Sequence, residues 1–278
     1  MGALRHLKIW FGGAILLLLF VCGVAAPLLA PYDPRSQTLE DRLQPPRWSE
    51  NGSSSYLLGT DNLGRDILSR IIYGSRISLL IGTSTVILAG LVGCTLGGVA
   101  GYFGATTDEL ISKVTEIFLA FPFLLIAIAI MAFLGQGVFN LILALMLSRW
   151  VQYCRVVRGE VLSLKERDFV AAARALGGKD LYILFRHVLP NTLASVTVIA
   201  TFAMAVVIIA EASLSFLGLG VPPHIPTWGS MLSEGRSYIN RAPWLTIFPG
   251  MAIFITVFGI NLLGDGLRDV FDPRLRRR

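Results

Sequence analysis

The sequence contains one glycine-rich stretch that can be compared with a phosphate-binding loop. Such a loop needs two glycines separated by four residues, with Lys and then Ser or Thr directly after the second glycine. In Gly177-Gly178-Lys179, Ala173 occupies the position of the first glycine and Asp180 that of Ser or Thr. We therefore expect no bound ATP on this chain.

Histidine and cysteine, the other common carriers of chemistry, form no recognisable site. The three histidines are far apart in the sequence, and neither a zinc-protease motif nor a nucleophile elbow is present. The three cysteines lie in or beside apolar segments, without the paired spacing of a disulfide framework or zinc site. We expect no catalytic residue, no metal ligand and no enzymatic activity.

Charged residues in or next to apolar runs are the remaining candidates. Glu211 lies well inside an apolar run, where an unpaired charge is costly, so it needs a partner or a wet cavity. It could line a substrate pathway or make a structural hydrogen bond. Asp61, Arg65, Asp66 and Arg70 alternate in charge just before another apolar run. They could form solvated ion pairs, or could act as a gate or as a contact for an external protein.

The composition indicates a protein that lies in a lipid bilayer. Hydrophobic residues make up 54% of the 278 residues and charged residues 15%, which is far to the apolar side of soluble domains. The net charge of +6 is dispersed between apolar runs instead of forming an aromatic-rich basic patch, so we expect no nucleic-acid partner.

Crossing the hydrocarbon core takes about 20 apolar residues, and six runs approach this length. They are residues 9–30, 77–101, 114–135, 138–158, 192–214 and 245–265. The fourth run is the weakest, because Arg149 and Arg155 interrupt it. Pro122 and Pro249 are expected to bend the third and sixth helices. The sequence thus predicts an all-α membrane protein with six transmembrane helices.

The first run also resembles a signal peptide, because Arg5 and Lys8 precede its apolar core and small residues follow. It continues to Ala30, however, which is long enough to span a membrane. We therefore favour an uncleaved anchor.

The distribution of basic residues predicts the orientation. With six spans, both termini share one side with residues 102–113 and 159–191. This side holds 15 Lys and Arg if Arg155 and Arg158 are included, against 8 on the other side, with Arg149 left unassigned. Basic residues favour the cytoplasm, so both termini are expected there. Residues 32–76 then form a hydrophilic external insert.

The second run carries small residues at every fourth position, at Gly93, Gly97 and Gly101. They leave one helix face without bulky side chains. This spacing is typical of close helix contact in membrane proteins.

The cytoplasmic segment between the fourth and fifth runs has the pattern of two short helices. Ser163 and Glu166 have the spacing of a capping box, and Phe169, Ala173 and Leu176 fall on one face of the helix that would follow. Gly177 and Gly178 can end that helix. Asp180 can cap a second one, and Pro190 is expected to break the chain before the fifth run. From these features alone, an amphipathic connector in the membrane interface explains the segment equally well.

A specific residue pattern favours a docking segment instead. Ala171-Ala172-Ala173, Gly177 and His187-Val188-Leu189-Pro190 resemble the EAA signature of bacterial importer permeases, whose loop docks into a nucleotide-binding subunit. Ala171 replaces the Glu of the general form, and His187 replaces its Ile.

Further stretches resemble the peptide/nickel permease family, and in particular its C-type subunit, over most of the chain beyond residue 50. They occur in the family's order and comprise Leu58-Gly59-Thr60-Asp61, Gly64-Arg65-Asp66, Gly101-Tyr102-Phe103-Gly104, Ala120-Phe121-Pro122, residues 214–220 and residues 261–269.

This resemblance implies a type I ABC importer permease fold, a bacterial inner-membrane location and transport of di- or oligopeptides. It implies a sister permease, two ATP-binding subunits that hold ATP and Mg²⁺, and an external solute-binding protein. The expected parts are an N-terminal helix with external loop (1–73), a five-helix core (74–266) with a coupling loop (160–190), and a basic cytoplasmic tail (267–278). Phe169, Leu176, Gly177 and Pro190 are then candidates for coupling.

Two alternatives remain open from the sequence. The same type of permease could carry nickel chelates or another small solute. A self-contained secondary transporter would have a similar composition, but it would not need the cytoplasmic helix pair.

Overall fold

The computed structural model describes residues 2–50 and 52–271, with side chains described from residue 6 onward. The described chain is mostly helical, as the long apolar runs predict. In chain order its elements are α1 (Gly2–Val24), α2 (Ala26–Leu29), η1 (Leu39–Asp41), α3 (Ile67–Phe103), α4 (Ala105–Leu119), α5 (Phe123–Leu134), α6 (Val138–Leu164), α7 (Asp168–Ala175), α8 (Asp180–Ile183), η2 (Leu184–Val188), η3 (Leu189–Thr192), α9 (Leu193–Phe216), α10 (Trp228–Gly235), η4 (Arg236–Tyr238) and α11 (Trp244–Phe271).

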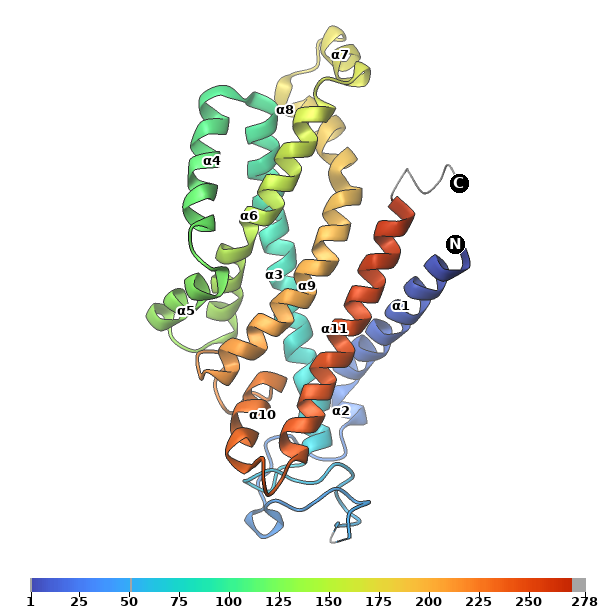
Figure 1. Ribbon diagram of the computed structural model, residues 1–278, viewed down its shortest axis with the longest axis vertical. Helices are drawn as coiled ribbons and strands as arrows, with labels where there is room; N and C mark the ends of the chain where they lie inside the picture. The colour runs from blue at the N-terminus through green and yellow to red at the C-terminus, as the bar shows by residue number, and fades with distance from the viewer. Residues whose placement is uncertain (1, 51, 272–278) are drawn as a thin grey trace.

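The long helices form an elongated bundle (Figure 1). One end carries α7 and α8, and the opposite end carries the loop that follows α2 together with α10. The start of α1 and the end of α11 both lie toward the end with α7, as an even number of crossings requires. The predicted tail (267–278) begins inside α11, and its residues 272–278 lie outside the described residues.

Four described helical segments are long and apolar enough to cross a membrane, or five if one bent pair counts as a single span. The four are His6–Val24, Ile67–Phe103, Asp180–Phe216 and Trp244–Phe271. The second begins at Ile67 and not at 77, because Asp66 caps it: the Asp66 carboxylate accepts a hydrogen bond from the Ser69 amide at 2.8 Å. Pro249 lies inside α11 without ending that helix.

The third expected span, 114–135, is not one helix. It consists of α4 and α5, which meet at an angle of 85°. Pro122 is the N-cap residue of α5, and the missing amide of proline prevents the helix from continuing. The predicted bend at Pro122 is therefore a complete break.

The boundaries predicted from the sequence for the two short helices between the fourth and fifth runs were partly wrong. Ser163 lies inside α6, so it does not open the first short helix, and α7 begins at Asp168 without a side-chain cap. Asp180 is the first residue of α8 and not its cap. The turn at Gly177 is where the sequence predicts it, with a φ of +84° that glycine adopts readily.

Pro190 does not break the chain, contrary to expectation. The helical path runs from Asp180 to Phe216, with a π-turn at η2 and a 3₁₀-turn at η3 where α8 joins α9. Pro190 falls in the first turn of η3, where a proline needs no amide partner. The change from π to 3₁₀ geometry at this junction therefore accommodates it.

The stripe of small residues on α3 packs against α6, as predicted. A Cβ atom at Gly93 would lie 2.3 Å from the carbonyl oxygen of Trp150, and one at Gly97 2.3 Å from that of Cys154. Even a methyl group is too large at either position. The two helix backbones can approach this closely only because these residues are glycines.

Replacing Gly97 with alanine is expected to push α3 and α6 apart. It should lower the free energy of unfolding by ~1–3 kcal/mol or more, the usual cost of overpacking. Gly90→Ala is the matched control, because its Cβ would meet nothing closer than a Tyr153 ring carbon at 3.7 Å. Fluorescence-detected size exclusion in detergent compares the yields of folded protein. Equal yields for the two variants would contradict the close contact.

Candidate functional site

The segment that joins α6 to α9 is fixed to the bundle by a small core of apolar side chains. Val170 of α7 and Ile183, Leu184 and Val188 of the α8–η2 region are fully buried. They pack against one another and against the ends of α3 and α6 that lie nearest α7. The α3 and α6 members of this cluster are Tyr102, Val157 and Val161. One side of the segment is thus held in place by packing against α3 and α6.

The other side of the same segment is apolar and uncovered. Leu176 is 89% exposed, which is unusual for a leucine beside a turn. Four further apolar side chains of the segment are also exposed, namely Phe169, Leu181, Tyr182 and Phe185. Of these, Phe185 also borders an apolar hollow between α3, α6 and α9. We call these five residues the apolar tip. An exposed apolar patch surrounded by charged residues commonly marks a protein-binding surface.

The remaining residues predicted for this loop take different places. Ala171 and Ala172 are exposed, while Ala173 is half-buried and packs against the core cluster below α7. Ala173 therefore lies on the buried side of the segment, whereas Phe169 and Leu176 lie on its exposed side. Pro190 is exposed and borders an apolar hollow between α3, α6 and α9.

Polar contacts fix the turn between α7 and α8. The Tyr102 hydroxyl donates to the Asp180 carboxylate at 2.9 Å, and Arg174 donates to the same hydroxyl at 3.3 Å. The hydrogen bond with Tyr102 raises the pKa of Arg174 above its ordinary value. The end of α3 is thereby linked directly to the segment that carries the apolar tip.

At the opposite end of the molecule, the alternating charges form a buried network instead of solvated pairs. Arg65 donates to Asp61 at 2.6 Å and to Glu234 at 2.7 Å. Arg70 pairs with Asp61 and, at 2.7 Å, with Glu234. The side chains of Arg70 and Asp61 are only 2% and 4% exposed. Two arginines therefore balance two carboxylates and join α3 and the loop that precedes it to α10.

Sequence reasoning missed Glu234, because it lies 164 residues from Arg70 and no local pattern marks it. Asp66 plays a different part from its neighbours, since it caps α3 and binds the Ser69 hydroxyl at 2.6 Å. Burial raises the pKa of Asp66, and the hydrogen bonds from Ser69 oppose that rise. Burial and a hydrogen bond to the Asp41 carboxylate together raise the pKa of Tyr56, in the loop before α3, to about 12.

Glu211 lies in α9 and is 1% exposed. Its carboxylate accepts hydrogen bonds from the Ser78 hydroxyl of α3 at 3.2 Å and from the Ser215 hydroxyl at 2.9 Å. The carboxylate therefore bridges two long helices in the interior of the bundle. This geometry favours the structural alternative for Glu211.

Replacing Glu211 with glutamine is expected to leave expression and uptake within about twofold of the unmodified protein. The amide oxygen can accept from one of the two hydroxyls, and the amide nitrogen can donate to the other. Glu211→Leu removes both hydrogen bonds and should lower the folded yield. Transport and yield are measured on the same membranes. A large loss of uptake with normal yield for Glu211→Gln would instead assign Glu211 to the pathway.

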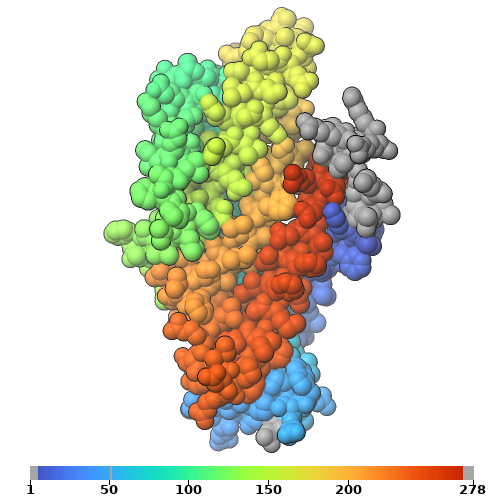
Figure 2. Space-filling model, viewed as in Figure 1, coloured from blue at the N-terminus to red at the C-terminus, as the bar shows by residue number. Residues whose placement is uncertain are grey.

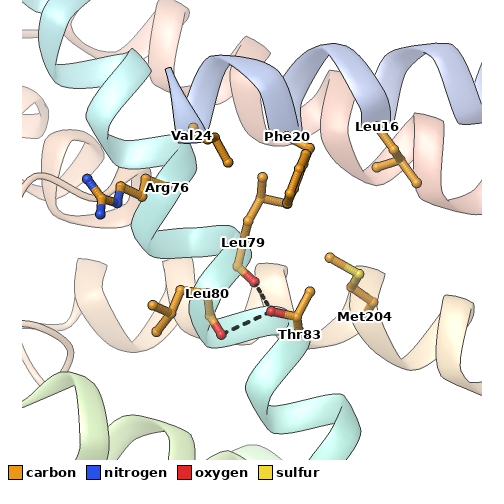
Figure 3. Close-up of a pocket in the computed structure, with 9 residues that line it drawn as sticks. Leu16, Phe20, Val24, Arg76, Leu79, Leu80, Thr83 and Met204 are labelled. Carbon is orange, nitrogen blue, oxygen red and sulfur yellow. Dashed lines mark hydrogen bonds between the residues drawn. The ribbon is translucent and has the colours of Figure 1, made fainter. Parts of the chain in front are cut away.

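An apolar groove lies between α1 and α3 (Figure 3), with a volume of about 440 Å³. The Thr83 hydroxyl in it donates to carbonyls of its own helix, at 2.6 Å to Leu79. Leu16, Phe20 and Met204 supply apolar surface, and Arg76 lies at one end. Such a lining suits lipid chains better than a polar solute.

Two family models of transport permeases match this chain. The model of the binding-protein-dependent transport system inner membrane component family matches residues 93–277. That of the N-terminal TM domain of oligopeptide transport permease C matches residues 5–46.

Several curated relatives are similar over nearly their whole length. The di/tripeptide transport system permease protein DppC of Pseudomonas aeruginosa is 45% identical, over 98% of this chain and 90% of its own. The glutathione transport system permease protein GsiD of Pectobacterium atrosepticum is 44% identical, over 95% and 86%. The oligopeptide permease OppC of Bacillus subtilis is 40% identical, over 96% and 85%.

A solved structure shares the fold. A chain of the MetNI methionine ABC transporter, in an inward-facing conformation, superimposes with a TM-score of 0.59 at 19% identity, over 73% of this chain and 97% of that one. The arrangement of the helices is therefore that of an ABC importer permease.

Proposed function

The chain belongs to the family of binding-protein-dependent transport system inner membrane components, and from this membership we propose that it helps to form the pathway by which di- and oligopeptides cross the bacterial inner membrane. The observation that carries this proposal is the 40–45% identity, over nearly the full chain, to permeases named for peptides. Import of nickel chelates or of another small solute is the alternative within the same type of permease.

The partners follow from the same membership. A sister permease forms the pathway together with this chain, two ATP-binding subunits supply the energy, and an external solute-binding protein delivers the peptide. ATP and Mg²⁺ belong to the ATP-binding subunits, and this chain performs no catalysis. The exposed apolar side chains of α4 and α5 support a partner on that side, where α5 projects from the body of the molecule (Figure 2).

We infer six membrane crossings, with both termini in the cytoplasm. The bent pair α4–α5 is the third crossing, and α6 is the fourth although it carries several arginines. Its 27 residues extend about 40 Å, which is longer than the hydrocarbon core. The anchor and external loop (1–73), the five-helix core (74–266) and the basic tail (267–278) remain our division of the chain.

The apolar tip is the surface that we assign to the ATP-binding subunits. Its outer face supplies apolar contacts, led by Phe169 and Leu176, while its inner face is anchored on α3 and α6. Gly177 provides the turn, and Ala171 and Ala172 leave the outer surface free of bulk. Motion of the docked subunits is thereby transmitted to the spans, which turns the pathway between inward-facing and outward-facing states. Pro190 begins the rigid path into α9.

We infer that the buried charge network keeps the external end of the bundle closed. Asp61, Arg65, Arg70 and Glu234 hold the external loop and α10 against the start of α3, so they stabilise the external end of the bundle. Asp66 sets where α3 begins. As a gate, this network would act by holding these elements together and not by binding the peptide.

Copurification tests the assembly. The tagged chain, extracted in mild detergent from its native membrane, is expected to bring down a sister permease and ATP-binding subunits in a 1:1:2 ratio, identified by mass spectrometry. The ratio is that of a heterodimeric pathway with one nucleotide-binding subunit on each permease. A chain that is purified alone and that moves solute in liposomes without ATP would instead be a secondary transporter.

A further inference from the structure

Arg149 is a charged residue of α6 that the functions proposed above do not use. It lies eleven residues after Val138, the first residue of α6, and thus about 16 Å along the helix axis. If α6 crosses the membrane, this position is near the middle of a hydrocarbon core about 30 Å thick. Its Nε and Nη2 atoms are buried and have no hydrogen-bond partner among the described residues.

The guanidinium of Arg149 lies at the break between α4 and α5. Its Cζ atom is 3.8 Å from the centroid of the Phe123 ring, and Phe123 is the first residue of α5. The next residue of α6, Trp150, packs edge-on against Phe118 of α4 with ring centroids 5.6 Å apart. Two consecutive residues of α6 therefore hold the two sides of the 85° break.

A second polar feature lies on the same pair of helices. A cavity of about 370 Å³ between α4 and α6 is lined by Ser112 and Glu116 of α4 and by Arg155 of α6. Arg155 is six residues nearer the cytoplasmic end of α6 than Arg149. The surface between these helices is thus polar over part of the depth of the membrane.

An unpaired guanidinium at this depth is costly, and the aromatic ring offsets only part of that cost. A hydrogen-bond acceptor from outside this chain, and most strongly an anion, would remove that cost. Ionisable residues inside the membrane and helices interrupted by proline both mark solute pathways in transporters, and here the two coincide. The C-terminal carboxylate is an anion that every unmodified peptide carries, and arginine can bind it through two parallel hydrogen bonds.

We propose that Arg149 binds the C-terminal carboxylate of the peptide as it passes the α4–α5 break. This inference rests on the proposed import of peptides. It makes Arg149 a specificity residue within the pathway, distinct from selection by the external binding protein.

The test uses the complete complex in proteoliposomes with ATP and its binding protein, and compares labelled trialanine with trialanine amide. Arg149→Gln is expected to lower uptake of trialanine at least tenfold and uptake of the amide less than twofold, while Arg149→Lys keeps part of the trialanine uptake. The control is Arg76→Gln, which replaces an exposed arginine of α3.

Equal losses of uptake for both peptides would overturn the proposal, because they indicate a structural role or pairing with the sister permease. Unchanged uptake of trialanine would overturn it as well.

A second measurement decides the question if the binding protein does not deliver the amide. Arg149→Cys is introduced after Cys22, Cys94 and Cys154 are replaced by alanine, and a hydrophilic thiol reagent is applied during ATP turnover. Labelling that slows when trialanine is present supports the proposal, and a thiol that does not react or is not protected overturns it. A wild-type complex that imports no trialanine would refute the peptide function itself, which is a separate outcome.

Discussion

Replacing Arg70 with methionine is expected to lower the free energy of unfolding by roughly 3–5 kcal/mol, the usual cost of removing one partner from a buried ion pair. Arg70 and Arg65 neutralise Asp61 and Glu234 at a site where the Arg70 side chain is 2% exposed. Without Arg70, the buried Asp61 and the partly exposed Glu234 share one arginine. An SDS titration of the purified protein, followed by circular dichroism, measures the loss.

Two further variants separate this charge imbalance from a loss of packing. Arg76→Met removes an exposed arginine from the same helix and should change the free energy of unfolding by less than about 0.5 kcal/mol. Adding Glu234→Gln to Arg70→Met restores the balance of one arginine and one carboxylate. The double variant should therefore be less destabilised than the sum of the two single changes, by more than ~1 kcal/mol. Strict additivity would contradict the network.

Replacing Leu176 with glutamate is expected to abolish most transport, by at least tenfold, without affecting the fold. The side chain is 89% exposed, so the folded chain loses no packing, whereas a charge within an apolar docking surface disrupts binding. A tenfold loss corresponds to ~1.4 kcal/mol of docking free energy. Uptake and copurified ATP-binding subunits are measured together, and both should fall in parallel.

Thr106→Glu is the matched control for this change. It adds the same charge at an exposed position in the first turn of α4, outside the apolar tip and outside residues 160–190. It should leave both uptake and copurification within about twofold. If Leu176→Glu behaved like this control, the apolar tip could not be the main docking surface.

Much of the fold could be predicted because the thickness of the bilayer sets the length of the apolar runs that cross it. The apolar runs led to the long helices, and the Gly93, Gly97 and Gly101 spacing identified the face of α3 that contacts α6. The turn at Gly177 was also predictable, since a positive φ favours glycine.

Other features depend on contacts that a linear pattern does not contain. Glu234 pairs with Arg70 across 164 residues, so the charged stretch before α3 was compatible with solvated ion pairs. The Ser163–Glu166 spacing suggested a cap, but packing on the apolar cluster under α7 extends α6 past Ser163. A proline can end a helix or start the next turn, which is why Pro122 and Pro190 have opposite effects here.

The candidate docking surface illustrates the same limit. The residue pattern located the loop, whereas the structure divides it into an anchored face with Val170 and an exposed face with Leu176. Helical spacing alone placed Phe169, Ala173 and Leu176 together. Which of these side chains is free to bind depends on where the neighbouring apolar cluster lies, and the sequence does not specify that position.

The most direct test of the central claim is uptake of labelled trialanine into proteoliposomes that hold this chain, its sister permease and the ATP-binding subunits, with the solute-binding protein on the outside. An importer subunit predicts accumulation above the external concentration only when ATP is enclosed, and none with a non-hydrolysable analogue. Equal uptake with and without ATP, or uptake by this chain alone, would contradict it.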